Sequence, residues 1–164
     1  MFEIMYNPTI GLISLIFGVV VFLVYLIAVR CDFGPLKSIS ISYYYVKPYW
    51  LFQVFIWASA FSILLSGQAI FFTLSGLCLV IMAAFPTIKE KEYYLPHMIF
   101  AISGLSLSIL GLGITFGLWY LIGALSLSVI VAYPIVKKRG TFIYWLEVLS
   151  ISTIIIGIFI GRFL

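Results

Sequence analysis

Long runs without charge restrict what this chain can fold into more than any other feature. Residues 4–29, 48–88 and 93–136 contain no Asp, Glu, Lys or Arg, and residues 140–161 contain only Glu147. A helix needs about 20 apolar residues to cross a bilayer. The first and last runs are therefore long enough for one crossing each, and each of the two middle runs is long enough for two.

The composition excludes two other classes of protein. Hydrophobic residues make up 65% of the 164 residues and charged residues make up 9%, against about 25% charged in an average soluble domain. So few charges cannot cover the surface of a water-soluble domain, and disordered chains are far less apolar. The sequence therefore predicts an integral membrane protein.

The predicted fold class is all-α: a polytopic bundle of six transmembrane helices, forming a single domain over residues 1–164. Glycine and polar residues near the centres of the two middle runs, at 66–68 and 113–117, suit tight turns between helices. A transmembrane β-barrel would need segments of strict alternation, which these runs lack. The helices are expected at about 9–29, 50–66, 69–86, 97–113, 118–136 and 142–162.

Basic residues predict the orientation in the membrane. Eight of the nine Lys and Arg residues lie in the loops 30–49, 87–96 and 137–141, and the ninth is Arg162. Because basic loops stay in the cytoplasm, we expect a multi-pass protein of a cell membrane, such as a bacterial inner membrane, with both termini outside. Membrane lipids are the expected partners. No basic patch with interleaved aromatic residues indicates a nucleic-acid partner, and a homo-oligomer is left open.

Two pairs of predicted helices resemble each other in sequence. Residues 77–89 match residues 125–137 at an offset of 48, and residues 105–117 match residues 149–161 at an offset of 44. One interpretation is a duplicated helical hairpin, formed by the third and fourth and by the fifth and sixth helices, as in many transporters. The other is chance matching within the small alphabet of membrane segments.

Glu147 is the only charge well inside a predicted helix, about two turns from its start. A carboxylate in hydrocarbon costs several kcal/mol, so such residues usually face the bundle interior or water. Glu147 is therefore a candidate ligand-binding residue. The alternative is a carboxylate near the headgroups that pairs with Lys137, Lys138 or Arg139.

His97 is the only histidine, and it is expected to open the fourth helix on the same side of the membrane as Glu147. It could bond the Glu147 carboxylate and titrate near neutral pH. The alternative is a helix-start residue after Pro96, bonded to water or to a carbonyl. One His and two Cys cannot form a zinc site or a bis-histidine haem site, so no metal and no cofactor are predicted.

Serine and isoleucine alternate in residues 38–42, and three tyrosines follow. Such alternation is typical of a strand, and a segment lying in the membrane interface is equally natural. No Asp and His lie near these serines in sequence, so no catalytic triad is predicted. The candidate ligand-binding residues, all expected near the cytoplasmic leaflet, are His97, Glu147, Ser40, Ser42, Tyr44 and Thr87.

Small residues recur along the fourth predicted helix, at Ala101, Gly104, Ser108 and Gly111, and along the fifth, at Ala124 and Ser128. Small faces let membrane helices approach closely. A packing face inside the bundle is one interpretation, and a row of hydroxyls lining a pore is the other.

Three pieces of the sequence occur in a distinctive order: Ser38-Ile39-Ser40-Ile41-Ser42-Tyr43-Tyr44-Tyr45, then Phe85-Pro86-Thr87, then His97. This order resembles small bacterial six-helix membrane proteins of unknown function with an SIS-x-YYY, FPT and His pattern. More distantly it resembles DRAM/Sfk-type membrane proteins, which are linked with lipid biology. The resemblance covers about residues 35–100. It implies a compact bundle with a cytoplasm-facing polar layer, and it places Ser40, Tyr44, Pro86, Thr87 and His97 on the shared positions.

These features favour a protein that binds, and moves or holds, a lipid or small amphiphile through a cytoplasm-facing polar layer. The alternatives are a channel or transporter for a small solute or proton, a lipid-modifying enzyme with His97 and Glu147 as an acid–base pair, and a structural subunit of a membrane complex. An enzyme is disfavoured, because no convincing nucleophile or metal set is recognised in the sequence.

Overall fold

The computed structural model describes residues 7–34, 36–66, 69–85, 91–137 and 140–164, without the side chains of 91–93 and 135. These residues form six α-helices and one short 3-10 helix, and no strand occurs among them, which confirms the all-helical fold class. The elements are α2 (Pro8–Phe33), η1 (Ser40–Tyr44), α3 (Trp50–Ser66), α4 (Ile70–Ala84), α5 (Lys91–Phe116), α6 (Trp119–Lys137) and α7 (Phe142–Phe163).

Three helical segments are long and apolar enough to cross a membrane: Pro8–Phe33, Tyr94–Phe116 and Phe142–Phe163. The other apolar helices are shorter. At 1.5 Å per residue, the 15-residue α4 is about 22 Å long, less than the roughly 30 Å of a bilayer's hydrocarbon core. The structure therefore supports a membrane protein with three candidate spans, and the six-span bundle stays a prediction.

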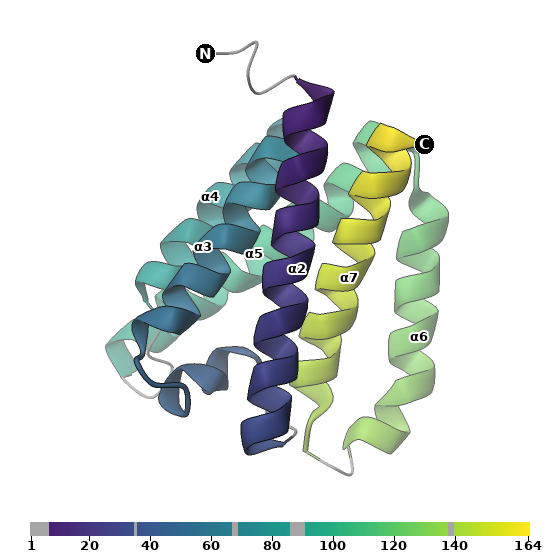
Figure 1. The fold of residues 1–164 in the computed structure, drawn as a ribbon. Helices are drawn as coiled ribbons and strands as arrows, with labels where there is room; N and C mark the ends of the chain where they lie inside the picture. Colours follow the sequence, from purple (N-terminus) through teal and green to yellow (C-terminus); the bar gives the residue numbers. More distant parts are fainter. Residues whose placement is uncertain (1–6, 35, 67–68, 86–90, 138–139) are drawn as a thin grey trace.

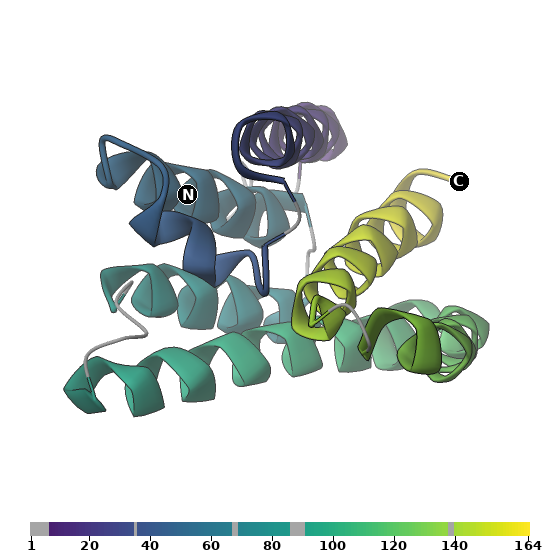
Figure 2. The ribbon, with the colours of Figure 1, turned by 90° about the horizontal axis from the view of Figure 1, so that it is seen from below.

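The helices pack mainly with their neighbours in sequence. Each helix from α2 to α5 contacts the next, and α7 contacts α2, α5 and α6. The start of α2 and the end of α7 lie at one end of the bundle, whereas the end of α2, η1 and the start of α7 lie at the other (Figure 1), which we call the η1 end. Seen along the bundle, α3, α4 and α5 are strongly tilted relative to α2 (Figure 2).

Local sequence explains where α2 begins and ends. The Asn7 side chain caps its start by accepting hydrogen bonds from the Thr9 and Ile10 amides at 2.9 and 3.3 Å, and Pro8 suits the first helical position. The helix ends at Gly34, whose φ of +72° suits a residue without a side chain. The helix was expected to end at residue 29, but the charged residues 30 and 32 do not interrupt it, because charge does not break a helix.

Two further boundaries differ from expectation. The helix expected at 97–113 runs from Lys91 to Phe116, with Pro96 inside its second turn. The expected turn at 113–117 is confined to Gly117, which has a φ of +69°. Gly113 instead remains helical, and its missing side chain leaves room for the Trp119 ring. Gly113 allows close packing inside the helix, so its presence wrongly suggested a turn.

Apolar side chains face both the inside and the outside of the bundle. Phe52, Phe72, Leu112, Ile154 and Ile158 are completely or almost completely buried. Along the outer face of α2, by contrast, large apolar side chains are more than half exposed, including Ile13, Phe17 and Val24. An apolar outer face is what a hydrocarbon surrounding requires. Of the described side chains of α6, none is buried, so α6 is the most peripheral helix.

The small residues of the fourth predicted helix lie at a helix interface. The Ser75 hydroxyl on α4 lies 2.6 Å from the Ser108 hydroxyl on α5 and donates to the Gly104 carbonyl at 2.6 Å. Gly104 also packs against Leu79. The structure thus favours the packing interpretation for α5. On α6, Ser128 is exposed and donates to the Ala124 carbonyl of its own helix.

The two helix pairs that match in sequence differ in local structure. Helix α4 ends at Ala84, before Phe85, whereas α6 continues through Tyr133 and Pro134 to Lys137. In addition, α4 packs between α3 and α5, whereas α6 lies at the edge of the bundle. The duplicated hairpin stays a prediction.

Candidate functional site

The segment around η1 folds into the bundle. Leu36, Ser38, Ile39, Ser40 and Ser42 are all buried, with exposed fractions of 8% or less. The segment is therefore not the strand that its alternation allowed, and its place at a membrane interface stays a prediction. A 3-10 turn places its serine hydroxyls inside the protein, where each must find a hydrogen-bond partner.

The hydroxyl of Ser42 joins η1 to α2. It donates to the Ile39 carbonyl at 2.6 Å and lies 2.6 Å from the Tyr25 hydroxyl. The Ser38 hydroxyl accepts a hydrogen bond from the Ile41 amide at 3.2 Å, closing the first turn of the segment. These bonds satisfy two of the three buried serines, so Ser42 has a structural role and is not available to a ligand in this arrangement.

The hydroxyl of Ser40 joins η1 to α5 through His97. His97 Nε2 lies 3.0 Å from Ser40 Oγ, and His97 Nδ1 lies 2.8 Å from the Phe85 carbonyl oxygen. A carbonyl can only accept, so a neutral imidazole must carry its proton on Nδ1. Nε2 is then the acceptor, and the Ser40 hydroxyl donates to it. His97 is 1% exposed, and it lies inside α5 rather than at its start.

Glu147 contacts the same segment from α7. Its Oε2 accepts a hydrogen bond from the Ile39 amide at 2.5 Å, and the Tyr144 amide one turn earlier donates to the Lys37 carbonyl at 3.0 Å. The expected bond between His97 and Glu147 is absent, because each side chain is bound to a different residue of the segment. Lys137, one of the expected partners, lies instead over the Tyr133 ring, and residues 138–139 lie outside the described residues.

A small cavity of about 60 Å³ adjoins these groups. Its polar lining consists of Ser40, Ser59 and Glu147, and its remaining lining is apolar, from η1, α3, α4, α5 and α7. A water molecule needs roughly 10–15 Å³ of such volume and two or more polar partners. The cavity is therefore large enough for a few waters or for one small polar group.

Of the two remaining candidates, Tyr44 does not line this cavity. Tyr44 is half-buried at the end of η1, with its ring edge against Tyr43. Thr87 lies outside the described residues. The structure therefore brings together Ser40, His97 and Glu147 around one short segment. Ser42 of that segment is bonded instead to Tyr25 of α2.

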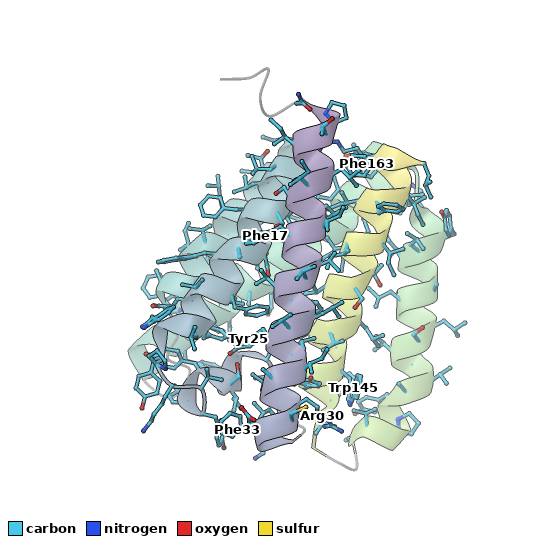
Figure 3. The ribbon with its side chains drawn as sticks, viewed as in Figure 1. Phe17, Tyr25, Arg30, Phe33, Trp145 and Phe163 are labelled. Carbon is cyan, nitrogen blue, oxygen red and sulfur yellow. The ribbon has the colours of Figure 1, made fainter. Side chains whose placement is uncertain are left out.

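A larger groove lies between α2 and α3. Its volume is about 540 Å³, and it is open toward the outside of the bundle. Apolar side chains of α2 and α3 form most of its walls. Asp32 and Lys47 lie at its η1 end, where the Phe33 and Tyr45 rings pack at 5.7 Å. In Figure 3, Tyr25 and Phe33 lie on this side of the lower half of α2, whereas Arg30 lies on the side of α7. A second groove, between α2 and α7, has about 260 Å³ and an entirely apolar lining.

Phe55 separates the groove from the cavity. Its ring lines both spaces, and it stacks on Tyr25 with ring centroids 4.1 Å apart. Since Tyr25 also bonds Ser42, the wall between the two spaces is tied to the η1 segment.

At the other end of the bundle, Arg162 is a polar residue whose role sequence reasoning missed. Its guanidinium donates to the Leu65 and Ser66 carbonyls at the end of α3 and to the Asn7 carbonyl before α2. A lone arginine near the end of the last helix was the only signal. Among the described residues, no three His, Cys, Asp or Glu side chains gather where they could hold a metal ion.

Comparison of this chain with protein-family models, with curated proteins and with solved structures finds no match. The resemblance in the order of the SIS, FPT and His motifs therefore stays a prediction. The function must therefore be inferred from the groove, the cavity and the groups around them.

Proposed function

We propose that this protein is a six-span integral membrane protein that binds a lipid or small amphiphile. The apolar part of the ligand would lie in the groove between α2 and α3, and its polar part would lie at the η1 end. The single observation that carries this proposal is the groove itself, which is apolar along its length and charged at one end.

The shape and chemistry of the groove match an amphiphile. The groove walls, including Val24 and Val54, offer apolar surface that is already exposed, so a chain lying there needs no opening of the bundle. Lys47 supplies a cation for a phosphate or carboxylate, and Asp32 supplies an anion for an ammonium group. The apolar α2–α7 groove offers no such end, so it would hold a chain without recognising a headgroup.

The polar layer predicted from sequence has a different part in this proposal. Ser42 and Tyr25 are bonded to each other, and Ser40 and His97 are bonded to each other. These residues therefore hold η1 and the Phe55 ring in place. The residues that would contact a headgroup are Asp32 and Lys47 instead.

A blocking substitution tests the groove. Ala28 lines it, so Ala28→Trp should fill its middle. Native mass spectrometry of the protein in a mild detergent, titrated with phosphatidylglycerol and with phosphatidylethanolamine, should show one bound lipid per chain. We expect Ala28→Trp to weaken that binding at least about tenfold, or about 1.4 kcal/mol.

Ala124→Trp is the matched control, since Ala124 is exposed on α6 and does not line the groove. It should bind lipid as the wild type does. Equal binding by wild type and Ala28→Trp, or equal loss in both tryptophan variants, would contradict the proposal. Lys47→Glu should lower binding of the anionic lipid more than binding of the zwitterionic one.

The channel, transporter and structural-subunit alternatives stay predictions, as does the duplicated hairpin. Ile39 and Ser40 of the bonded segment 37–42 line the cavity beside Glu147. A solute path from this cavity to the η1 end would pass that segment.

A further inference from the structure

Ser40 and His97 have the arrangement of a nucleophile and its base. The Ser40 hydroxyl lies 3.0 Å from His97 Nε2, within the distance at which a proton can be transferred. The Phe85 carbonyl, 2.8 Å from Nδ1, holds the ring in the tautomer that leaves Nε2 as the acceptor. In serine hydrolases the same orienting role falls to a third group bonded to the far nitrogen of the histidine.

The surroundings of the pair also fit a reaction site. Ser40 lines the small cavity, so a reacting carbonyl has a space beside this residue, and the cavity is large enough for a few waters. The partners of the equally buried Ser42 are a tyrosine and a backbone carbonyl. Neither of them is a base, so Ser42 is not activated.

Glu147 acts on Ser40 through the backbone. Its carboxylate holds the amide of Ile39, the residue before Ser40, at 2.5 Å. This bond sets the position of the Ser40 hydroxyl relative to His97, so Glu147 is a positioning residue. Hydrogen bonds from His97 of α5 and Glu147 of α7, together with the Phe85 carbonyl that follows α4, thus fix the surroundings of the Ser40 hydroxyl.

We propose that Ser40 is a catalytic nucleophile, activated by His97, that accepts an acyl group from an ester in the membrane. Ser40 Oγ bonds the ester carbonyl carbon and its proton passes to His97 Nε2. The carbon–oxygen bond to the alcohol then breaks, and the leaving alcohol takes that proton, so that an acyl–Ser40 ester remains. A water or an acceptor hydroxyl reverses these steps, giving its proton to Nε2, which returns it to Ser40 as the acyl group leaves.

The inference rests on the proposed function only for the class of substrate, an acyl ester of an amphiphile. The groove and the cavity share the Phe55 ring as a wall, so movement of that ring would join the place where an acyl chain lies to the place where Ser40 lies. The nucleophile itself can be tested with a small probe that does not need the groove.

The test uses a short-chain alkyl fluorophosphonate, which phosphonylates activated serines with loss of fluoride. The full-length protein in detergent or nanodiscs should gain one adduct per chain, mapped to Ser40 by peptide mass spectrometry. Ser40→Ala should abolish the adduct. His97→Ala should slow its formation by about 10²- to 10⁴-fold, the range expected for loss of a general base.

Ser128→Ala, at an exposed serine of α6 that donates to the Ala124 carbonyl of its own helix, is the control and should be labelled like the wild type. Glu147→Gln retains an acceptor for the Ile39 amide and should be labelled nearly normally, whereas Glu147→Leu should be labelled more slowly. These two variants keep the proposal testable if His97→Ala fails to fold. Ala28→Trp should keep the adduct even though it blocks the groove, so failure of lipid binding and failure of the nucleophile are separate results.

A folded wild-type protein that is not labelled, or that is labelled at another residue, overturns the proposal. So does labelling of Ser40→Ala at the wild-type rate. The pair would then be a structural tether between η1 and α5, and His97→Ala would lower thermal stability without any change in labelling.

Discussion

Arg162 shows how one residue can join three parts of the chain. Its guanidinium binds the last carbonyls of α3 and the Asn7 carbonyl before α2, although it comes from the last turn of α7. Carbonyls at a helix end have no partner within the helix, and a cation is favoured there by the helix dipole. Its Nε is the one buried side-chain nitrogen or oxygen without a partner among the described residues.

Arg162→Met should therefore destabilise the protein, because the carbonyls at the end of α3 lose their donor while the apolar stem is kept. Hydrogen bonds to a charged group contribute about 1.5–3 kcal/mol each, so we expect a loss of roughly 2–3 kcal/mol. The measurement is unfolding by a denaturing detergent, followed by circular dichroism. Arg30→Met, at an exposed arginine of the opposite end, is the control, and an equal loss there would remove the special role of Arg162.

At the scale of the elements, α2 and α3 approach closely where Gly18 faces Ser62. A side-chain carbon at Gly18 would meet the Ser62 side chain, which is itself buried and bonded to the Ala58 carbonyl. Close approach of two membrane helices at small residues is the usual way in which they associate without a hydrophobic driving force. This contact sets the distance between the two walls of the groove.

Gly18→Leu should force α2 and α3 apart. Overpacking of this kind costs about 1–3 kcal/mol, and the change should also alter lipid binding, because the same two helices form the groove. Gly123→Leu on α6 is the matched control, since no atom lies within 4 Å of the added carbon, and it should leave stability within about 0.5 kcal/mol of the wild type. The detergent unfolding assay compares the two. Similar midpoints for both variants would contradict the close-approach argument.

At the scale of the whole molecule, the arrangement of the ends agrees with the predicted sidedness without testing it. The start of α2 and the end of α7 lie at one end of the bundle, and η1 and the start of α7 lie at the other (Figure 1). An even number of crossings requires this arrangement. The basic residues Arg30, Lys37 and Lys47 all belong to the η1 end, which the positive-inside rule assigns to the cytoplasm.

Single-cysteine variants test this topology in a background with Cys31→Ser and Cys78→Ser. In intact cells, a membrane-impermeant maleimide should label Tyr120→Cys, because Tyr120 is exposed near the start of α6 at the end opposite η1. Lys37→Cys should be labelled only after the cells are permeabilised. Labelling of Lys37→Cys but not of Tyr120→Cys in intact cells would indicate the opposite orientation. Labelling of both variants in intact cells would rule out the six-span arrangement.

The sequence by itself determined the all-helical fold class and the general position of each described α-helix, but not the 3-10 helix η1. These properties depend on hydropathy and charge summed over windows of about 20 residues, and such sums need no knowledge of which helices meet. Helix ends were less accurate, because Gly113 and Pro96 looked like breaks but both lie inside α5. Of the candidate site, Ser40, His97 and Glu147 were recognised individually from the sequence.

Only the tertiary structure decided how those residues are connected. Ser40 and His97 are 57 positions apart, and Ile39 and Glu147 are 108 positions apart, so no spacing rule relates them. Sequence reasoning paired His97 with Glu147, whereas burial of η1 gave each its own partner on that segment. The groove likewise exists only where α2 and α3 pack side by side. Such features depend on which helix faces meet, and this depends on the packing of all the helices together.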